Sequence, residues 1–143
     1  MKKNIIYKLL YRATRDGNDA QIFYKKCDNI METLAIIKTT KGMRFGGYTE
    51  KKWIISSPTT TFYKDYKGIC FCFSLDLFRI YDFNGNSRRS IGCYYGSGPY
   101  FLDDNMVFLK YIIVIIYYLG IHHILRKALL LENLLKIMKL IMD

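Results

Sequence analysis

The sequence predicts one domain of mainly β or α+β class, a β-sandwich with a helix near its start. Short apolar segments with β-branched or alternating residues recur between turn signals from Thr33 to Tyr100. Clear helical spacing appears before them, between residues 19 and 27. A chain of 143 residues with 51% hydrophobic residues is long enough for one buried core and too short for two independent ones.

The N-terminal part is predicted to enter the domain through a turn and a helix. Residues 4–13 fit a short helix or a strand equally well, and residues 15–18 form a turn cluster. Residues 19–27 are predicted to be a helix, because apolar side chains recur there at helical steps. Asp16 or Asn18 is expected to cap this helix, and Asp28 and Asn29 are expected to end it.

The next segment is predicted to be a β-hairpin followed by a core anchor. Residues 33–39 and 43–48 are the expected strands, with a turn at Lys41 and Gly42. Gly46 and Gly47 are expected at the end of the second strand, where absent side chains permit a bulge or a close backbone approach. Trp53 is expected to be buried.

Further strands are predicted beyond a surface loop at residues 56–66. In GICFCFSL, strict alternation places Phe71 and Phe73 on one face and Cys70, Cys72 and Ser74 on the other. Residues 77–83 are the next expected strand, and the NGNS turn at residues 84–87 follows it. A last strand begins at residue 90 and leads into a glycine-rich corner.

The composition changes after Asn105, so the chain is divided into a domain at residues 1–105 and a tail at residues 106–143. The tail is predicted to form apolar helical segments. Residues 111–125 lack charged side chains but are short for a bilayer span, and residues from 125 onward read as a basic amphipathic helix. Two interpretations stay open: the tail is genuine, or the reading frame shifts near Asp104.

Charge and cysteine usage restrict the partners. A formal charge of +10 attracts anions, but the cations are scattered from Lys2 to Lys139 and form no stripe beside stacking aromatic residues. Nucleic acid is therefore an unexpected partner. The chain opens without a secretory signal, which predicts reduced thiols and a cytoplasmic location. Cys70 and Cys72 lack the CxxC spacing of a metal site, so no metal and no cofactor are expected.

One alternative gives the thiols a chemical role as scavengers of oxidants. Lys25 and Lys26 precede Cys27 and would favour its thiolate. Cys27 also shares a helical stripe with Ala20 and Phe23, which predicts a buried and inert thiol. No arrangement of Ser, His and Asp or of Cys and His for nucleophilic catalysis is apparent.

Four ordered blocks resemble the TLDc domain family. They are LLYRATRDG with CDN, then TLAIIKTTKGMRFGGYTEKKW, then FCFSL, then GSGPYF. The matching residues are Arg12, Arg15, Asp16, Gly17, Phe23, Cys27, Asp28, Asn29, Gly46, Gly47, Tyr48, Trp53, Gly98 and Pro99. Structural roles are expected for them: the charged pair beside Gly17 suits a turn, and the glycine pair lacks the helix of a phosphate loop. The closing strands of the family are not recognisable after Pro99.

The resemblance implies a two-sheet β-sandwich flanked by helices, without catalytic residues. It also implies a link to protection against oxidative stress and to binding of the vacuolar proton-pumping ATPase. We therefore expect a non-enzymatic interaction module with an acidic or membrane-peripheral protein partner. The alternatives are a protein attached to a membrane by residues 106–143 and a thiol-dependent antioxidant.

Overall fold

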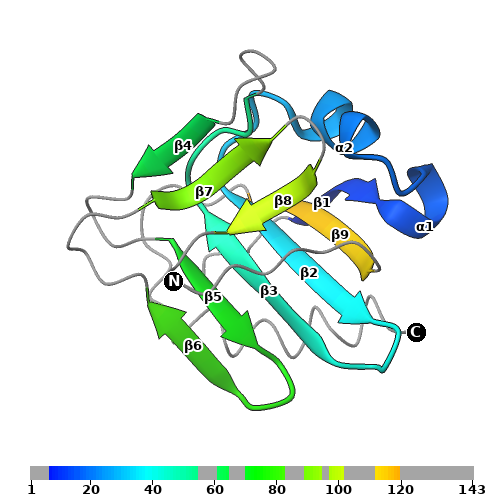
Figure 1. Ribbon diagram of the computed structural model, residues 1–143, viewed down its shortest axis with the longest axis vertical. Helices are drawn as coiled ribbons and strands as arrows, with labels where there is room; N and C mark the ends of the chain where they lie inside the picture. The colour runs from blue at the N-terminus through cyan, green and yellow to red at the C-terminus, as the bar shows by residue number, and fades with distance from the viewer. Residues whose placement is uncertain are drawn as a thin grey trace, which may run out of the picture.

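The computed structural model of the protein describes residues 7–54, 61–64, 70–82, 89–94, 97–101 and 112–119 (Figure 1). These ranges form two short helices and antiparallel sheets, which confirms the mainly β prediction. The helices are α1 (Ala13–Asp16) and α2 (Ala20–Cys27). The strands are β1 (Tyr7–Arg12), β2 (Thr33–Thr39), β3 (Arg44–Thr49), β4 (Thr61–Lys64), β5 (Phe71–Ser74), β6 (Arg79–Asp82), β7 (Arg89–Tyr94), β8 (Ser97–Phe101) and β9 (Ile112–Leu119).

The larger sheet has six strands in the order β1-β9-β2-β3-β5-β6. Its centre contains the predicted hairpin, in which β2 and β3 pair from Thr33 opposite Thr49 to Lys38 opposite Arg44. The amide of Thr39 donates to the carbonyl oxygen of Met43 over 2.8 Å and closes the turn. Gly42 has a φ of 85°, a left-handed conformation that glycine adopts without steric cost. The hairpin prediction is confirmed.

The prediction of a helical tail is wrong for residues 112–119. These residues form β9, which lies between β1 and β2 and pairs with both, with Ile115 opposite Arg12 and Ile36. A run of β-branched residues fits this position, because a strand with neighbours on both sides benefits from bulky side chains. Residues 106–111 and 120–143 lie outside the described ranges. Among the residues that the structure describes, no helix is both long and apolar enough to span a bilayer.

The smaller sheet has three strands in the order β4-β7-β8 and corrects two further predictions. Thr61–Lys64 lies in the expected surface loop but forms β4, which pairs with β7. Gly98 and Pro99 lie within β8, not in a corner that follows a strand. Proline is tolerated there because β8 is an edge strand, with a neighbouring strand on one side only.

The two sheets and α2 meet around the indole of Trp53. The indole is fully buried and makes edge-to-face contacts with Phe23 of α2 and Phe101 of β8, at centroid distances of 5.3 and 5.6 Å. Its Nε1 donates to Oγ1 of Thr33 on β2 over 2.7 Å. Figure 1 shows β7, β8 and α2 on the same side of the larger sheet. The prediction that Trp53 anchors the core is confirmed.

Gly46 and Gly47 lie inside β3, not at its end as predicted. A Cβ atom on Gly46 would collide with the carbonyl oxygen of Ala35 on the neighbouring strand and with the ring of Phe73. A Cβ atom on Gly47 would lie 2.7 Å from the ring of Phe101. The predicted close backbone approach is present at Gly46, whereas at Gly47 the neighbour is a side chain, the ring of Phe101 on β8 in the smaller sheet.

The alternation in β5 follows the prediction with one exception. Phe71 and Phe73 are buried, whereas Cys72 and Ser74 are half-buried. Cys70, which precedes the strand, is fully buried, and its Sγ lies 3.3 Å from Oγ1 of Thr49.

The position of β9 can be tested with a proline at its centre. We expect Ile115→Pro to lower the free energy of unfolding by about 3 kcal/mol more than Ile115→Ala does, because only proline removes the amide. Urea unfolding of the two purified variants measures the difference. Equal stabilities would show that residues 112–119 do not pair on both sides.

Candidate functional site

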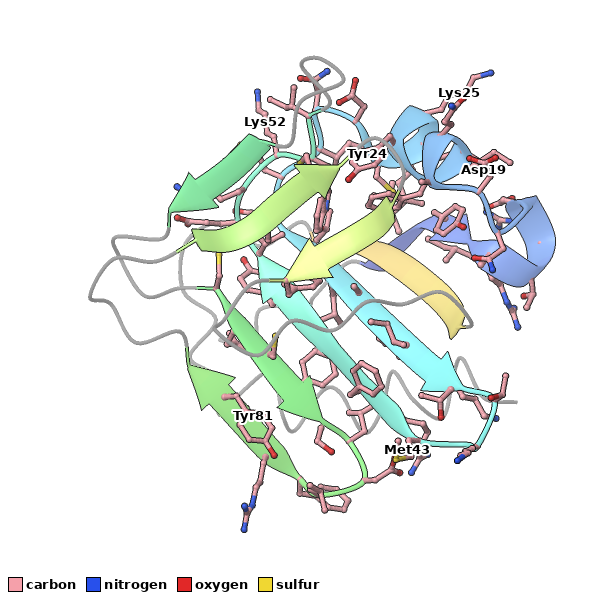
Figure 2. The ribbon with its side chains drawn as sticks, in the orientation of Figure 1. Asp19, Tyr24, Lys25, Met43, Lys52 and Tyr81 are labelled. Carbon is pink, nitrogen blue, oxygen red and sulfur yellow. The ribbon has the colours of Figure 1, made fainter. Side chains whose placement is uncertain are left out.

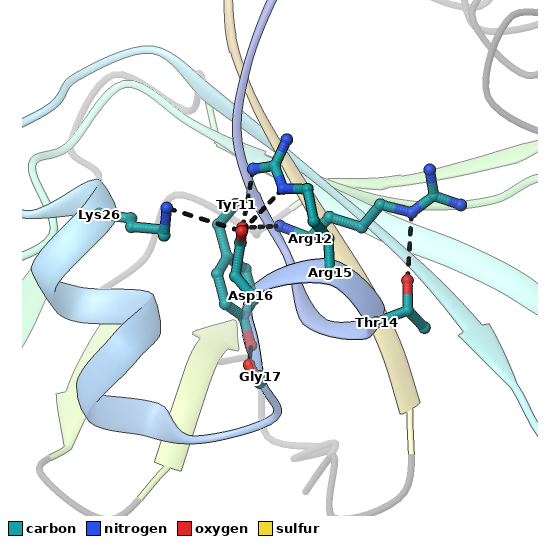
Figure 3. A network of polar contacts seen from close by, with 7 residues as sticks. All are labelled: Tyr11, Arg12, Thr14, Arg15, Asp16, Gly17 and Lys26. Atoms are coloured by element: carbon teal, nitrogen blue, oxygen red, sulfur yellow. Dashed lines mark hydrogen bonds and ion pairs between the residues drawn. The ribbon is translucent and has the colours of Figure 1, made fainter.

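A network of polar contacts surrounds the carboxylate of Asp16, at the corner where β1 meets α1 (Figure 3). Its Oδ1 accepts from Nε of Arg15 over 2.7 Å, and its Oδ2 accepts from Nη2 of Arg15 over 2.8 Å. The backbone amide of Arg12 donates to Oδ2 over 2.9 Å, and Nζ of Lys26 on α2 lies 3.6 Å from Oδ1. The single carboxylate therefore joins β1, α1 and α2.

These contacts stabilise the ionised, negatively charged form of Asp16. The hydrogen bond from Arg15 and then that from the Arg12 amide hold the pKa of Asp16 well below its usual range. The same hydrogen bond raises the pKa of Arg15. The Asp16 side chain is only 8% exposed, while Arg15 is 50% exposed, so the cation faces solvent and the anion lies beneath it.

Gly17 and Tyr11 shape the turn that follows α1. Gly17 has a φ of 108°, and a Cβ atom there would lie 2.9 Å from Cδ1 of Ile22. The hydroxyl of Tyr11 donates to the carbonyl oxygen of Gly17 over 2.8 Å. Burial, followed by the charge of Asp16, raises the pKa of Tyr11 to about 12, so the hydroxyl keeps the proton that this bond requires.

Helix α2 confirms the predicted helix and corrects its cap. The N-cap is Asp19, whose Oδ1 accepts from the amide of Gln21 over 2.7 Å. Neither Asp16 nor Asn18 is the N-cap. The helix ends at Cys27 with Asp28 as its C-cap, as predicted, and Asn29 turns the chain with a φ of 62°. The amide of Asn29 then donates to the carbonyl oxygen of Trp53 over 2.9 Å. The end of α2 is thereby tied to the core anchor.

The outer surface of this corner is cationic. Phe23, Tyr24 and Cys27 point inward and are buried. Exposed cationic side chains come from the end of β1, from α1 and from the last turn of α2, and we name this set the basic corner: Arg12, Arg15, Lys25 and Lys26. Figure 2 shows Lys25 projecting from α2 into solvent.

Three of the four cysteines are buried, and Cys72 is half-buried. Cys27 is fully buried, and burial raises its pKa to about 12. Lys26 lowers this pKa by a smaller amount, as the sequence suggested. Cys93 is buried with a pKa raised to about 11, and Cys70 is fully buried. At neutral pH Cys27 and Cys93 hold their protons, a state in which a thiol is a poor nucleophile.

The structure places most of the residues singled out in the sequence in three groups. Arg12, Arg15, Asp16 and Gly17 gather at the basic corner. Phe23, Cys27 and Trp53 share the core cluster, and Gly46, Gly47 and Tyr48 lie in β3. In the part of the chain that the structure describes, no group of three His, Cys, Asp or Glu side chains could hold a metal ion.

Sequence reasoning missed three contributors: Tyr11, Lys26 and Phe101. The hydroxyl of Tyr11 donates to the carbonyl oxygen of Gly17, and Lys26 pairs with Asp16. The ring of Phe101, from the smaller sheet, packs over Gly47. Tyr11 stands within the LLYR block and Phe101 within the GSGPYF block, which were the available signals. Local spacing gives no signal that Lys26 approaches Asp16.

Acid sensitivity tests the role of Asp16. The lowered pKa means that its stabilising effect is present above the unfolded-state pKa, near 4, and is lost as the pH falls below it. We expect Asp16→Asn to be less stable than the unchanged protein at about pH 7, with a gap that narrows toward about pH 3. Urea midpoints at both pH values measure this, with exposed Asp28→Asn as the control. A gap that is independent of pH would contradict it.

Thiol accessibility tests the cysteine assignment. We expect a thiol reagent to modify half-buried Cys72 first in the native protein and to reach Cys27 and Cys93 only after unfolding. Mass spectrometry of the modified peptides identifies the order. Peroxide consumption should be unchanged by Cys27→Ser, and a loss of consumption would restore the thiol-dependent alternative.

Comparison with known proteins agrees with the motif blocks. The family model described as the TLDc domain matches residues 2–108. A comparison with curated proteins finds no match. The matched segment includes the basic corner, α2, the β2–β3 hairpin and the three-stranded sheet, while β9 lies beyond it. The chain belongs to the TLDc domain family.

Proposed function

We propose that the protein is a non-enzymatic interaction module of the cytoplasm that binds an acidic protein surface through the basic corner. The TLDc family is linked to oxidation resistance and to protein interaction. The observation that carries the proposal is that four exposed cations from three elements lie at one corner, where the nearly buried carboxylate of Asp16 pairs with the side chains of Arg15 and Lys26. A fixed cationic surface attracts acidic partners and sets the orientation of the complex.

The proposed partner is a membrane-peripheral assembly such as the vacuolar proton-pumping ATPase, which the family resemblance implies. The proposed fold is the two-sheet sandwich of the family, supported by the packing of Phe101 over Gly47 and against Trp53.

The two alternatives are less well supported. Burial and the raised pKa of Cys27 disfavour a thiol-dependent antioxidant. The other alternative attaches the protein to a membrane through residues 106–143. Residues 112–119 of this segment disfavour it, because they pair within the larger sheet.

Charge reversal at the basic corner tests the proposal. Arg12→Glu with Lys25→Glu leaves the contacts of Asp16 in place, because Asp16 binds the backbone amide of Arg12. We expect binding to the detergent-solubilised, immobilised ATPase to fall by about tenfold or more, with a steep dependence on salt.

The matched control is Lys41→Glu with Arg79→Glu, which changes the net charge equally at a distant place. It should bind like the unchanged protein. Equal binding by both double variants, or no binding of the unchanged protein, would contradict the proposal.

A further inference from the structure

Two turns of the larger sheet leave it at the same end. Strands β3 and β5 are antiparallel with Phe45 opposite Ser74, so the β2–β3 turn and the β5–β6 turn are neighbours. Figure 1 shows both turns at the lower end of the molecule. We name residues 40–43 and 75–78 together the tip.

The tip is held in one shape by Asp76. Its Oδ2 accepts from the backbone amide of Arg44 over 2.6 Å, and its Oδ1 accepts from Nε and Nη2 of Arg44 over 2.9 and 2.7 Å. The amide of Leu75 donates to the carbonyl oxygen of Arg44 over 3.0 Å. Each turn is therefore fixed to the other.

The tip presents large apolar side chains to solvent. Met43, Leu77 and Phe78 are 58%, 63% and 65% exposed, the highest values among the large hydrophobic residues whose side chains the structure describes. Leu75 of the same turn is buried, so the core does not require Leu77 and Phe78. Phe78 also has a φ of 51°, a conformation that is costly for a bulky side chain. The fold does not explain why an exposed phenylalanine occupies this position.

Cations flank these apolar side chains. Lys38, Lys41 and Arg79 lie at or beside the two turns, and Arg44 pairs with Asp76, the one carboxylate among residues 38–44 and 75–79. Exposed apolar side chains with cations beside them fit the boundary of an anionic bilayer, where the former enter the acyl region and the latter meet headgroups. Figure 2 shows Met43 at this end, far from Lys25.

We propose that the tip docks the protein onto an anionic membrane surface, with Met43, Leu77 and Phe78 inserted and Lys38, Lys41 and Arg79 at the headgroups. This surface is separate from the basic corner and does not rest on the proposed partner. A few apolar residues with a small cationic rim give reversible binding.

Vesicle co-sedimentation of the full chain tests the proposal. We expect binding to vesicles of phosphatidylcholine mixed with phosphatidylserine, and binding that is about tenfold weaker both to phosphatidylcholine alone and at high salt. Leu77→Ser with Phe78→Ser should weaken binding by about tenfold or more. Met31→Ser, an exposed apolar residue elsewhere, is the matched control and should bind normally.

Two variants of Phe78 separate insertion from folding. Glycine accepts a positive φ, so Phe78→Gly should keep or raise the urea midpoint while it weakens vesicle binding. In Phe78→Trp, the new indole should shift its emission to the blue with anionic vesicles, while Trp53, the one native tryptophan, is buried and should not respond.

The outcomes are decisive. Loss of vesicle binding in the serine and glycine variants of the tip, together with the blue shift in Phe78→Trp, supports the proposal, whatever the ATPase experiment gives. Vesicle binding that persists in the serine and glycine variants places the contact elsewhere in the chain and overturns it. No vesicle binding at all also overturns it and assigns the tip to a protein partner.

Discussion

The burial of one indole is the constraint on which the arrangement of the elements depends. Trp53 contacts α2 through Phe23, the smaller sheet through Phe101 and β2 through Thr33. Its carbonyl oxygen also receives the amide of Asn29 just after α2. A buried indole N–H without an acceptor would cost about 1–3 kcal/mol, which explains why a threonine is buried beside it. Because three elements meet on one side chain, their positions are not independent.

The sequence pattern was sufficient to predict those elements whose formation depends on residues close together in the chain. Helix α2 and the β2–β3 hairpin followed from apolar spacing and turn residues, since both form through neighbours in the sequence. Strand β9 did not, because a continuous apolar run has neither the helical nor the strand period. Its five consecutive β-branched residues, IIVII, were the signal that favours a strand. Strand β4 is a four-residue segment, TFYK, that follows the threonine run of the predicted loop, and only its pairing with β7 defines it.

The candidate site was predictable in its residues but not in its connections. The Arg15, Asp16 and Gly17 turn was expected, and Asp16 does satisfy a backbone amide there. That Lys26 approaches the same carboxylate depends on the packing of α2 against β1, which spacing does not reveal. For Gly46 and Gly47 too, the sequence did not reveal which side chains approach from other elements. A close approach was expected, but the approaching side chains, Phe73 and Phe101, come from other strands.

The two proposed surfaces are compatible with simultaneous use. The basic corner lies at the β1 edge of the larger sheet, while Leu77 and Phe78 of the tip follow β5, four strand spacings from β1. Four strand spacings amount to ~19 Å, enough that neither surface covers the other. A membrane contact of a few apolar side chains is weak by itself. It would still concentrate the protein at the surface where a membrane-peripheral partner resides, so two modest contacts can act as one stronger one. In that arrangement Phe78, at the membrane, and the basic corner, at the partner, both hold the protein at the same membrane surface from separate places on the sheet.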